Sequence, residues 1–307
     1  MIRRLRAAYA AYNLLQYRAL ARNAALYRKY GLRKPYFAGV AAADFSVLGA
    51  AAAAEPPRQT TLEEVPFYGR QTADVQRSIR DFDRTGYCII PGFWDAARVA
   101  AVNTEIERLL RDGTVKYRYG NKLMFAIRKS EVLQQACAHG GLGGLLDHLI
   151  RGEARLFQSI NFLRGSEQRT HSDSIHMTTY PAGGLLGVWI ALEDVDADNG
   201  PVHYYPGSHH WPYYTNADFG NAGGRFLLGR AGYPAYEAFI AERLAESPLE
   251  KQIFRARAGD LLIWHANLLH GGEPHHDPAR SRKSMVLHYF DANRICYHEI
   301  TERPALL

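Results

Sequence analysis

Residues 258–290 read AGDLLIWHANLLHGGEPHHDPARSRKSMVLHYF, and two apolar runs in this stretch decide the fold. The runs at 260–265 and 285–290 are short, and glycine, proline and charged residues separate them. Similar short runs occur at 156–163, 187–192, 202–205 and 252–256. Short apolar segments divided by turn residues are typical of strands in a sandwich or barrel. The sequence therefore predicts a β-rich body.

Helices are expected mainly before these strands. Val99, Val102, Ile106 and Leu109 recur at helical spacing, and Gly113 follows as a stop signal. Two more helices are predicted at 75–82 and 142–150, with an apolar strand at 86–93 and an inserted loop and helix at about 208–250. Long insertions in a compact β-fold are often lids or binding loops. The overall prediction is a mainly β fold with flanking helices.

The positive charge is confined to the N-terminus. The chain has 307 residues and a formal charge of +6, yet all 31 acidic residues lie at or beyond Asp44 and nine basic residues precede it. The remainder holds 28 basic against 31 acidic residues, which is a formal charge of −3. A basic tail on a slightly acidic body does not indicate a nucleic-acid partner.

Residues 1 to about 34 are predicted to form a basic amphipathic helix, and 38–57, rich in Ala and Gly, to form a spacer. The predicted organisation is an extension and spacer at 1–60 and a β-domain at 61–307. The helix has three alternative roles: docking on its own body or on another subunit of a homo-oligomer, peripheral membrane contact, or organelle targeting.

Cysteine usage and hydropathy bear on location. Cys88, Cys137 and Cys296 are far apart and form no CxxC, so neither a disulfide framework nor a zinc knuckle is predicted. The sequence has no run of eighteen or more apolar residues, so no transmembrane helix is expected. We expect a reducing, cytoplasmic location. Peripheral contact with a membrane surface is left open.

Three residues offer the ligands of a metal site. His171 and Asp173 stand at i and i+2, so on an extended segment both side chains point to the same side. His270 ends the apolar run LLIWHANLLH and is followed by Gly271 and Gly272. Two imidazoles and one carboxylate on one face, with open positions opposite, are the donor set of non-haem Fe(II) oxygenases. The predicted metal ligands are therefore His171, Asp173 and His270.

Arg282 lies twelve residues after His270, where the next strand begins. A buried guanidinium is costly unless it is paired, and its planar fork matches a carboxylate in two hydrogen bonds. A dicarboxylate co-substrate can chelate iron through one end and engage Arg282 with the other.

The chain from about residue 86 to 290 resembles the phytanoyl-CoA dioxygenase family of Fe(II)/2-oxoglutarate oxygenases. The resemblance is carried by DFDRTGYCIIPGF, HSD, WIALEDVDADNGPVHYYPGSH, AGDLLIWHANLLHGG and RKSMVLHYF, in the family's order. It implies a double-stranded β-helix, the cupin-like jelly roll. It also implies that Fe(II) is held by the three ligands and 2-oxoglutarate by Arg282, with Trp189 and Asn161 near the co-substrate.

Two positions depart from the family pattern where it has secondary co-substrate contacts. Gly272 stands where the family often has a serine that hydrogen-bonds 2-oxoglutarate, and His275 and His276 stand near a common asparagine. Among the other histidines, His265 is expected to be a core residue, and His176 to be either a bystander or a group that contacts the ligands or the substrate.

The predicted activity is oxidation, usually hydroxylation, of a small-molecule or lipid-like substrate with O₂, as 2-oxoglutarate becomes succinate and CO₂. The alternative is a non-catalytic β-helix that binds a small molecule or scaffolds a complex. The sequence leaves the identity of the substrate open.

Overall fold

The computed structural model describes residues 4–46, 48, 58–138 and 140–306. Its largest element is a seven-stranded sheet in which every neighbouring pair is antiparallel. Across this sheet the strands are β1 (Tyr87–Ile90), β9 (Leu261–His265), β6 (Leu185–Ala191), β11 (Ser284–Asp291), β4 (Ala154–Phe162), β3 (Lys122–Met124) and β2 (Tyr117–Arg118).

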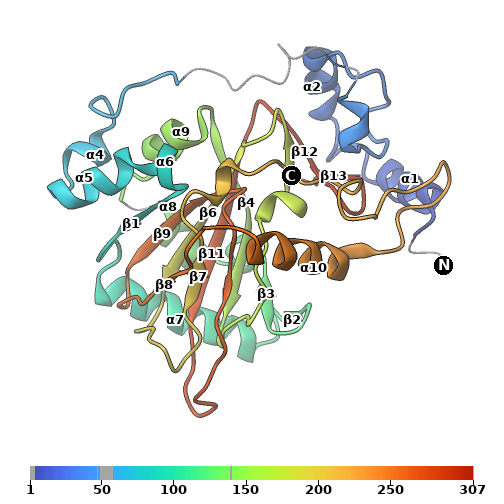
Figure 1. The fold of residues 1–307 in the computed structure, drawn as a ribbon. Helices are drawn as coiled ribbons and strands as arrows, with labels where there is room; N and C mark the ends of the chain where they lie inside the picture. The colour runs from blue at the N-terminus through green and yellow to red at the C-terminus, as the bar shows by residue number, and fades with distance from the viewer. Residues whose placement is uncertain (1–3, 47, 49–57, 139, 307) are drawn as a thin grey trace.

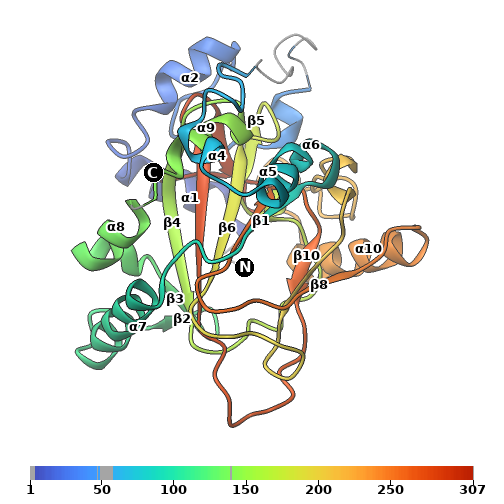
Figure 2. The ribbon, with the colours of Figure 1, turned by 90° about the vertical axis from the view of Figure 1, so that its left-hand side faces the viewer.

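Two three-stranded sheets complete the β-structure. One has the order β10 (His270–Gly272), β7 (Val202–Tyr204), β8 (Gln252–Phe254), and the other β13 (Arg303–Pro304), β12 (Ile295–His298), β5 (Thr178–Tyr180). Figure 2 shows β8 and β10 on one side of the large sheet and α7 and α8 on the other. The predicted double-stranded β-helix with flanking helices is confirmed.

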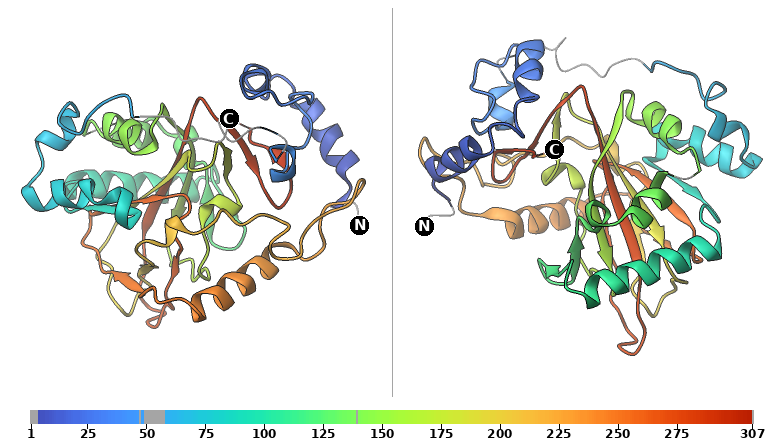
Figure 3. Two further views of the ribbon diagram at one scale, coloured as in Figure 1. Left: turned by 45° about the horizontal axis from the view of Figure 1, so that its top comes forward. Right: turned by 180° about the vertical axis from the view of Figure 1, so that it is seen from behind.

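Helices cover the outer face of the large sheet (Figures 1 and 3). They are α4 (Pro66–Gly69), α5 (Ala73–Arg80), α6 (Phe82–Thr85), α7 (Ala96–Arg111), α8 (Glu131–Ala138) and α9 (Gly143–Ile150), with the 3₁₀ turn η3 (Ala126–Lys129). The side chain of Asp95 accepts a hydrogen bond from the Arg98 amide and so begins α7, while Gly113 follows its end with φ +76°.

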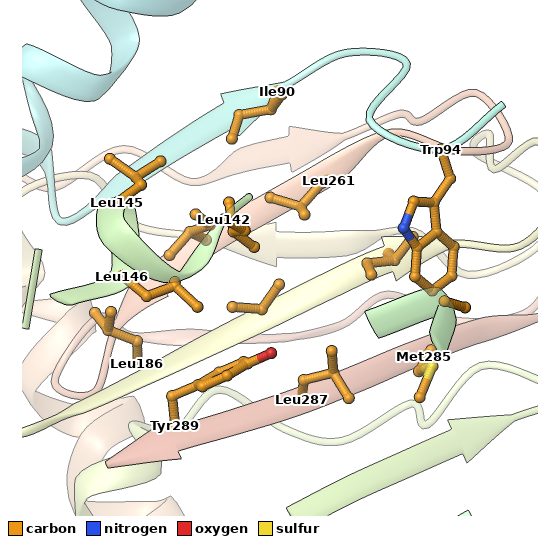
Figure 4. Packing of buried hydrophobic residues seen from close by; sticks show 14 of the residues in the cluster. Ile90, Trp94, Leu142, Leu145, Leu146, Leu186, Leu261, Met285, Leu287 and Tyr289 are labelled. Carbon is orange, nitrogen blue, oxygen red and sulfur yellow. The ribbon is translucent and has the colours of Figure 1, made fainter. Parts of the chain in front are cut away.

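Two apolar cores lie on opposite faces of the large sheet. The outer core joins the helices to residues such as Ile90, Leu186, Leu261 and Leu287, which Figure 4 shows interdigitating. The inner core, between the large and small sheets, includes Ile160, Trp189, Val202, Phe254, Leu262 and Trp264. Because the central strands β6, β9 and β11 are buried on both faces, their sequences read as nearly continuous apolar runs.

The structure of the N-terminal segment differs from the prediction. The single helix expected over 1–34 is divided into α1 (Arg6–Leu15) and α2 (Asn23–Tyr30), with turns between them. Turn hydrogen bonds of the i to i+3 type, such as Gln16 amide to Asn13 carbonyl, replace helical ones there. The break lets α1 lie beside β13 and α2 beside β12 (Figure 1).

The N-terminal segment docks on the protein's own body. Arg6 forms an ion pair with Glu302, and Arg22 donates to the Ala292 carbonyl. Leu26, Tyr27 and Phe45 form an apolar cluster with residues of β5 and β12. The 3₁₀ turn η2 (Ala42–Asp44) lies within the predicted spacer, whose residues 47 and 49–57 are outside the described residues.

Candidate metal and co-substrate site

Three buried side chains meet between the large and small sheets. His171, Asp173 and His270 each offer a ligand atom, and these three atoms lie within 4.8 Å of one another. His171 Nε2 is 3.9 Å from Asp173 Oδ1, and His270 Nε2 is 3.8 Å from Asp173 Oδ2. The structure thus brings together the three residues that the sequence singled out, close enough for one ion to reach all three.

Backbone pairing explains why these distant residues converge. The amides of His171 and His270 each donate to the other residue's carbonyl at 2.9 Å. Directly opposed residues of an antiparallel pair present their side chains on the same side. Ser172 is extended, so Asp173 at the start of η4 (Asp173–Ile175) points the same way as His171.

Both imidazoles turn Nε2 toward Asp173, and the Nε2 of His171 also lies 3.0 Å from the Gln168 amide nitrogen. His171 Nδ1 lies 2.8 Å from the Arg169 carbonyl, and His270 Nδ1 lies 2.9 Å from the Leu268 carbonyl. Because a carbonyl only accepts, each Nδ1 carries the proton and each Nε2 keeps its lone pair. Burial, and then the nearby His270, lower the pKa of His171 well below its ordinary value, so this imidazole is neutral at pH 7.

The Asp173 carboxylate is oriented from two strands. Trp264 Nε1 on β9 donates to Asp173 Oδ2 at 2.7 Å, and His288 Nε2 on β11 lies 3.4 Å from the same oxygen. Burial alone would raise the pKa of Asp173, but the imidazoles of His270 and His288 outweigh it and lower that pKa. The carboxylate is therefore ionised, with Oδ1 left to face His171.

Gly187 makes this arrangement possible. It lies on β6 directly between Trp264 of β9 and His288 of β11. A Cβ at position 187 would stand 2.3 Å from the Trp264 ring, so the indole can lie against β6 only because a glycine is there. The roles of Trp264, His288 and Gly187 were not predicted from the sequence, where a tryptophan within an apolar strand is typical of a core residue.

We expect Trp264→Phe to weaken Fe(II) binding about 10–100-fold, the usual cost of removing a group that orients a metal ligand. The phenyl ring keeps most of the packing but cannot donate to Asp173. Anaerobic calorimetric titration measures the effect, with Trp94→Phe, whose indole nitrogen has no hydrogen-bond partner among the described residues, as the matched control. Equal Fe(II) affinity in the Trp264 and Trp94 variants would show that the indole does not position the ligand.

The inserted helix α10 (Gly232–Ala245) braces the HSD segment. The Tyr236 hydroxyl accepts from the Ser172 amide at 3.0 Å and lies 2.9 Å from Ser172 Oγ. Ser174 Oγ donates to Asn267 Oδ1, which ties the segment to the loop that leads to His270. The insertion thus packs against the backbone that carries two of the three candidate ligands.

Arg282 is buried without a carboxylate partner among the described residues. Its Nη1 donates to Ser284 Oγ at 2.5 Å, its Nε has no hydrogen-bond partner in this part of the chain, and its exposure is 2%. Burial lowers the pKa of Arg282 to about 10, partly offset by Glu193, so the guanidinium stays charged at pH 7. An unpaired buried cation at the end of a cavity fits the free carboxylate of a dicarboxylate.

Trp189 and Asn161 differ in where the structure places them. Trp189 lines the cavity, and its ring lies 5.7 Å from the Arg282 guanidinium carbon. On β4, Ile160 and Phe162 line the same cavity, whereas Asn161 does not, because successive residues of a strand face opposite sides. The predicted co-substrate contact of Asn161 is therefore wrong for this structure: the residue pairs with Leu123 on β3 and faces away from the cavity.

The structure shows which groups lie beside Gly272 and His275, the positions that depart from the family pattern. A Cβ at Gly272 would lie 2.9 Å from Ser166 Oγ, and Ser166 lines the cavity. A serine hydroxyl from another loop therefore occupies the space beside position 272. His275 lines the cavity as well, and its Nε2 lies 3.1 Å from the Arg280 carbonyl.

The remaining histidines separate into two groups. His176 lines the cavity, with its ring centre 6.3 Å from that of His171, and burial lowers its pKa to about 3. His265 lies outside this cavity, next to Tyr213 and His209, and burial lowers its pKa to about 3. His265 is thus a neutral packing residue, as expected from its place within a strand.

The triad, Arg282, Trp189 and His176 line one cavity of about 1230 Å³. Its wall near Arg282 is largely apolar, with Ile160, Phe162, Trp189 and Val286. Its donor set of two imidazoles and one ionised carboxylate is the facial triad that suits Fe(II), and the unpaired Arg282 suits the co-substrate. Fold and site together define the class of cupin-like proteins with a His-Asp-His metal site.

The chain belongs to the phytanoyl-CoA dioxygenase (PhyH) family, whose sequence model matches residues 82–284. Ectoine dioxygenase of Stutzerimonas stutzeri is 27% identical over 253 residues, which cover 75% of this chain and 82% of that one. Phytanoyl-CoA dioxygenase domain-containing protein 1 of Mus musculus is 30% identical over 131 residues. That match covers 42% of this chain and only 40% of the mouse protein.

Solved structures share the fold. The non-heme alpha ketoglutarate dependent carbocyclase SnoK from nogalamycin biosynthesis superposes with a TM-score of 0.60 at 19% identity, covering 74% of this chain and 87% of that one. EctD from S. alaskensis with 2-oxoglutarate and 5-hydroxyectoine has a TM-score of 0.54 at 19% identity, covering 78% and 83%. At these identities the likeness establishes the fold alone.

Proposed function

We propose that this protein is an Fe(II)- and 2-oxoglutarate-dependent oxygenase that hydroxylates a small-molecule substrate. The observation that carries the proposal is a buried His-Asp-His triad that shares one cavity with a buried arginine lacking a carboxylate partner among the described residues. Family membership supports the same activity. When bound, Fe(II) and 2-oxoglutarate supply O₂ activation, with succinate and CO₂ as the co-products.

The residues of the chain have separate tasks in this activity. His171, Asp173 and His270 hold Fe(II), and Trp264 and His288 fix the carboxylate. Arg282 binds the far carboxylate of 2-oxoglutarate, while Trp189 and Phe162 flank its guanidinium at 5.7 Å and keep water from it. Because Asp173 supplies a carboxylate ligand, a halide has no vacant ligand position, which favours hydroxylation over halogenation.

Turnover with Fe(II), ascorbate, O₂ and 2-oxoglutarate tests the proposal. We expect slow succinate formation without substrate and faster formation with a molecule that fills the cavity, whose product gains one ¹⁸O atom from ¹⁸O₂. Absence of succinate with every candidate would favour the alternative, a non-catalytic β-helix that binds a small molecule or scaffolds a complex.

We also propose peripheral membrane contact through the outer face of α1. Leu14 and Leu15 are 52% and 80% exposed, and residues 1–43 contain nine basic and no acidic residues. Exposed apolar residues beside basic ones are typical of interfacial helices. Among the described residues, no helix has the length and apolarity needed to span a bilayer.

We expect Leu15→Glu to reduce flotation of the full chain with phosphatidylserine-containing vesicles about tenfold or more, because inserting one leucine contributes about 1.5–3 kcal/mol. The control is Val132→Glu, an exposed residue on α8. If both variants float like the wild type, or if the wild type does not float, α1 is not a membrane contact.

A further inference from the structure

A second set of cations lines the cavity beyond the metal site. Lys122 lies on β3 and Arg303 on β13, and both line the cavity without an ion pair among the described residues. Arg303 is paired across the strands with His298, whose ring lies 5.3 Å from that of His176. We call Lys122 and Arg303, together with the neighbouring neutral imidazoles of His176 and His298, the basic wall; of its members, only His176 was given a candidate role from the sequence.

Lys122 is held near the metal site by neutral groups. Its Nζ donates to Gln168 Oε1 at 3.0 Å, and the Gln168 amide nitrogen lies 3.0 Å from His171 Nε2 and 2.9 Å from the Tyr233 hydroxyl. The ammonium is thus placed close to where oxidation would occur and within electrostatic reach of Asp173, but it forms no ion pair in the described chain.

Arg303 is similarly unsatisfied. Its Nε is buried without a hydrogen-bond partner among the described residues, and its guanidinium carbon lies 4.6 Å from the Tyr12 ring of α1. The neighbouring carboxylates are engaged elsewhere, since Glu302 pairs with Arg6 and Glu299 accepts from the Asn216 amide. The docked N-terminal helix therefore fixes Arg303 in place without neutralising it.

The formal charges that line the cavity indicate the sign of the charge on a further ligand. Its charged lining residues are four cations, Lys122, Arg164, Arg282 and Arg303, and two carboxylates, Glu167 and Asp173. Fe(II) and the 2-oxoglutarate dianion cancel each other, so two positive charges remain with the imidazoles counted as neutral. Cations in a cavity of low dielectric favour a bound anion.

We propose that the substrate is an anion, a small molecule that bears a carboxylate or a phosphate, and that Lys122 and Arg303 neutralise its charge at the basic wall. The assignment rests on the proposed function, which supplies the reaction. It adds the substrate class and two residues that determine specificity. It also assigns the N-terminal extension a function, which is to hold Arg303 in place, because Tyr9 and Tyr12 of α1 pack on Arg303.

Ligand-induced thermal shifts test the proposal on the full chain, loaded anaerobically with Fe(II) and stoichiometric 2-oxoglutarate. The probes are hexanoate, methyl phosphate and the neutral hexanamide. We expect at least one anion to bind at least tenfold more tightly than hexanamide. Lys122→Met and Arg303→Met should each remove most of that preference, whereas Arg155→Met, at an exposed arginine paired with Glu153, should keep it. Preference for hexanoate or for methyl phosphate distinguishes the two kinds of anion.

Two results would overturn the proposal: the wild type binds no probe anion better than hexanamide, or the Lys122 and Arg303 variants keep the wild-type preference. Failure of the proposed function is seen separately, in the Fe(II) and 2-oxoglutarate titrations of the same proteins. If Arg303→Met lowers the melting temperature by loosening α1, Lys122→Met, which leaves that contact intact, decides the outcome.

Discussion

Asp173→Ala is expected to abolish stoichiometric Fe(II) binding, with a loss of affinity of more than about 100-fold. Removing a residue that only orients a ligand costs about 10–100-fold, and Asp173 is itself the sole carboxylate of the triad. Anaerobic titration of Fe(II), followed by calorimetry, measures this loss. No succinate should form with this variant.

Alanine at 173 also leaves the Trp264 indole without its acceptor, which costs about 1–3 kcal/mol of folding stability. Asp173→Asn separates the two effects, because the amide oxygen can still accept from Trp264 while the ligand charge is gone. Asp74→Ala, at an exposed aspartate on α5, is the control for loss of a carboxylate alone. Wild-type Fe(II) affinity in Asp173→Asn would remove this residue from the metal site.

Arg282→Met should weaken 2-oxoglutarate binding about 100-fold or more while leaving Fe(II) binding intact. A hydrogen bond to a charged group contributes about 1.5–3 kcal/mol, and two such bonds to one carboxylate account for at least this factor. Titration of 2-oxoglutarate into the Fe(II)-loaded protein measures it. The Michaelis constant for 2-oxoglutarate should rise in parallel.

The melting temperature of Arg282→Met shows whether the variant is still folded and so serves as the control. Replacing a buried, unpaired charge by an apolar side chain of similar length is often neutral or stabilising, so we expect the melting temperature of the ligand-free protein to be unchanged or higher. A variant that lost 2-oxoglutarate because it unfolded would instead melt earlier. Unaltered 2-oxoglutarate affinity in a folded Arg282→Met protein would contradict the assignment.

The central strands β6, β9 and β11 of the large sheet could be predicted because both of their faces are buried, whereas the short strands β2 and β3 at one edge were missed. The runs at 260–265 and 285–290 correspond to β9 and β11, and the helix around Val99 to α7. Strands such as β10 and β13 were missed because they have two or three residues, with glycine or proline among them. Their pairing depends on the tertiary fold rather than on local propensity.

The metal triad could be predicted from residue type and spacing, but the direction of Asn161 could not. Residues 159–162 of β4 are all buried, so no alternation of polar and apolar positions shows which side faces the cavity. The donation from Trp264 to Asp173 was also hidden, because it depends on the glycine across the strands at 187. The break between α1 and α2 was missed because residues 16–22 contain neither glycine nor proline to mark it.

The proposed metal site requires His270, although this residue lies far along the chain from His171 and Asp173. The most direct measurement is anaerobic titration of Fe(II) and 2-oxoglutarate into the wild type and His270→Ala. We expect one Fe(II) per wild-type chain, tight 2-oxoglutarate binding only when Fe(II) is present, and loss of both in the variant. Fe(II) binding that is unaffected by His270→Ala, or 2-oxoglutarate binding of equal strength with and without metal, would contradict the proposed metal site.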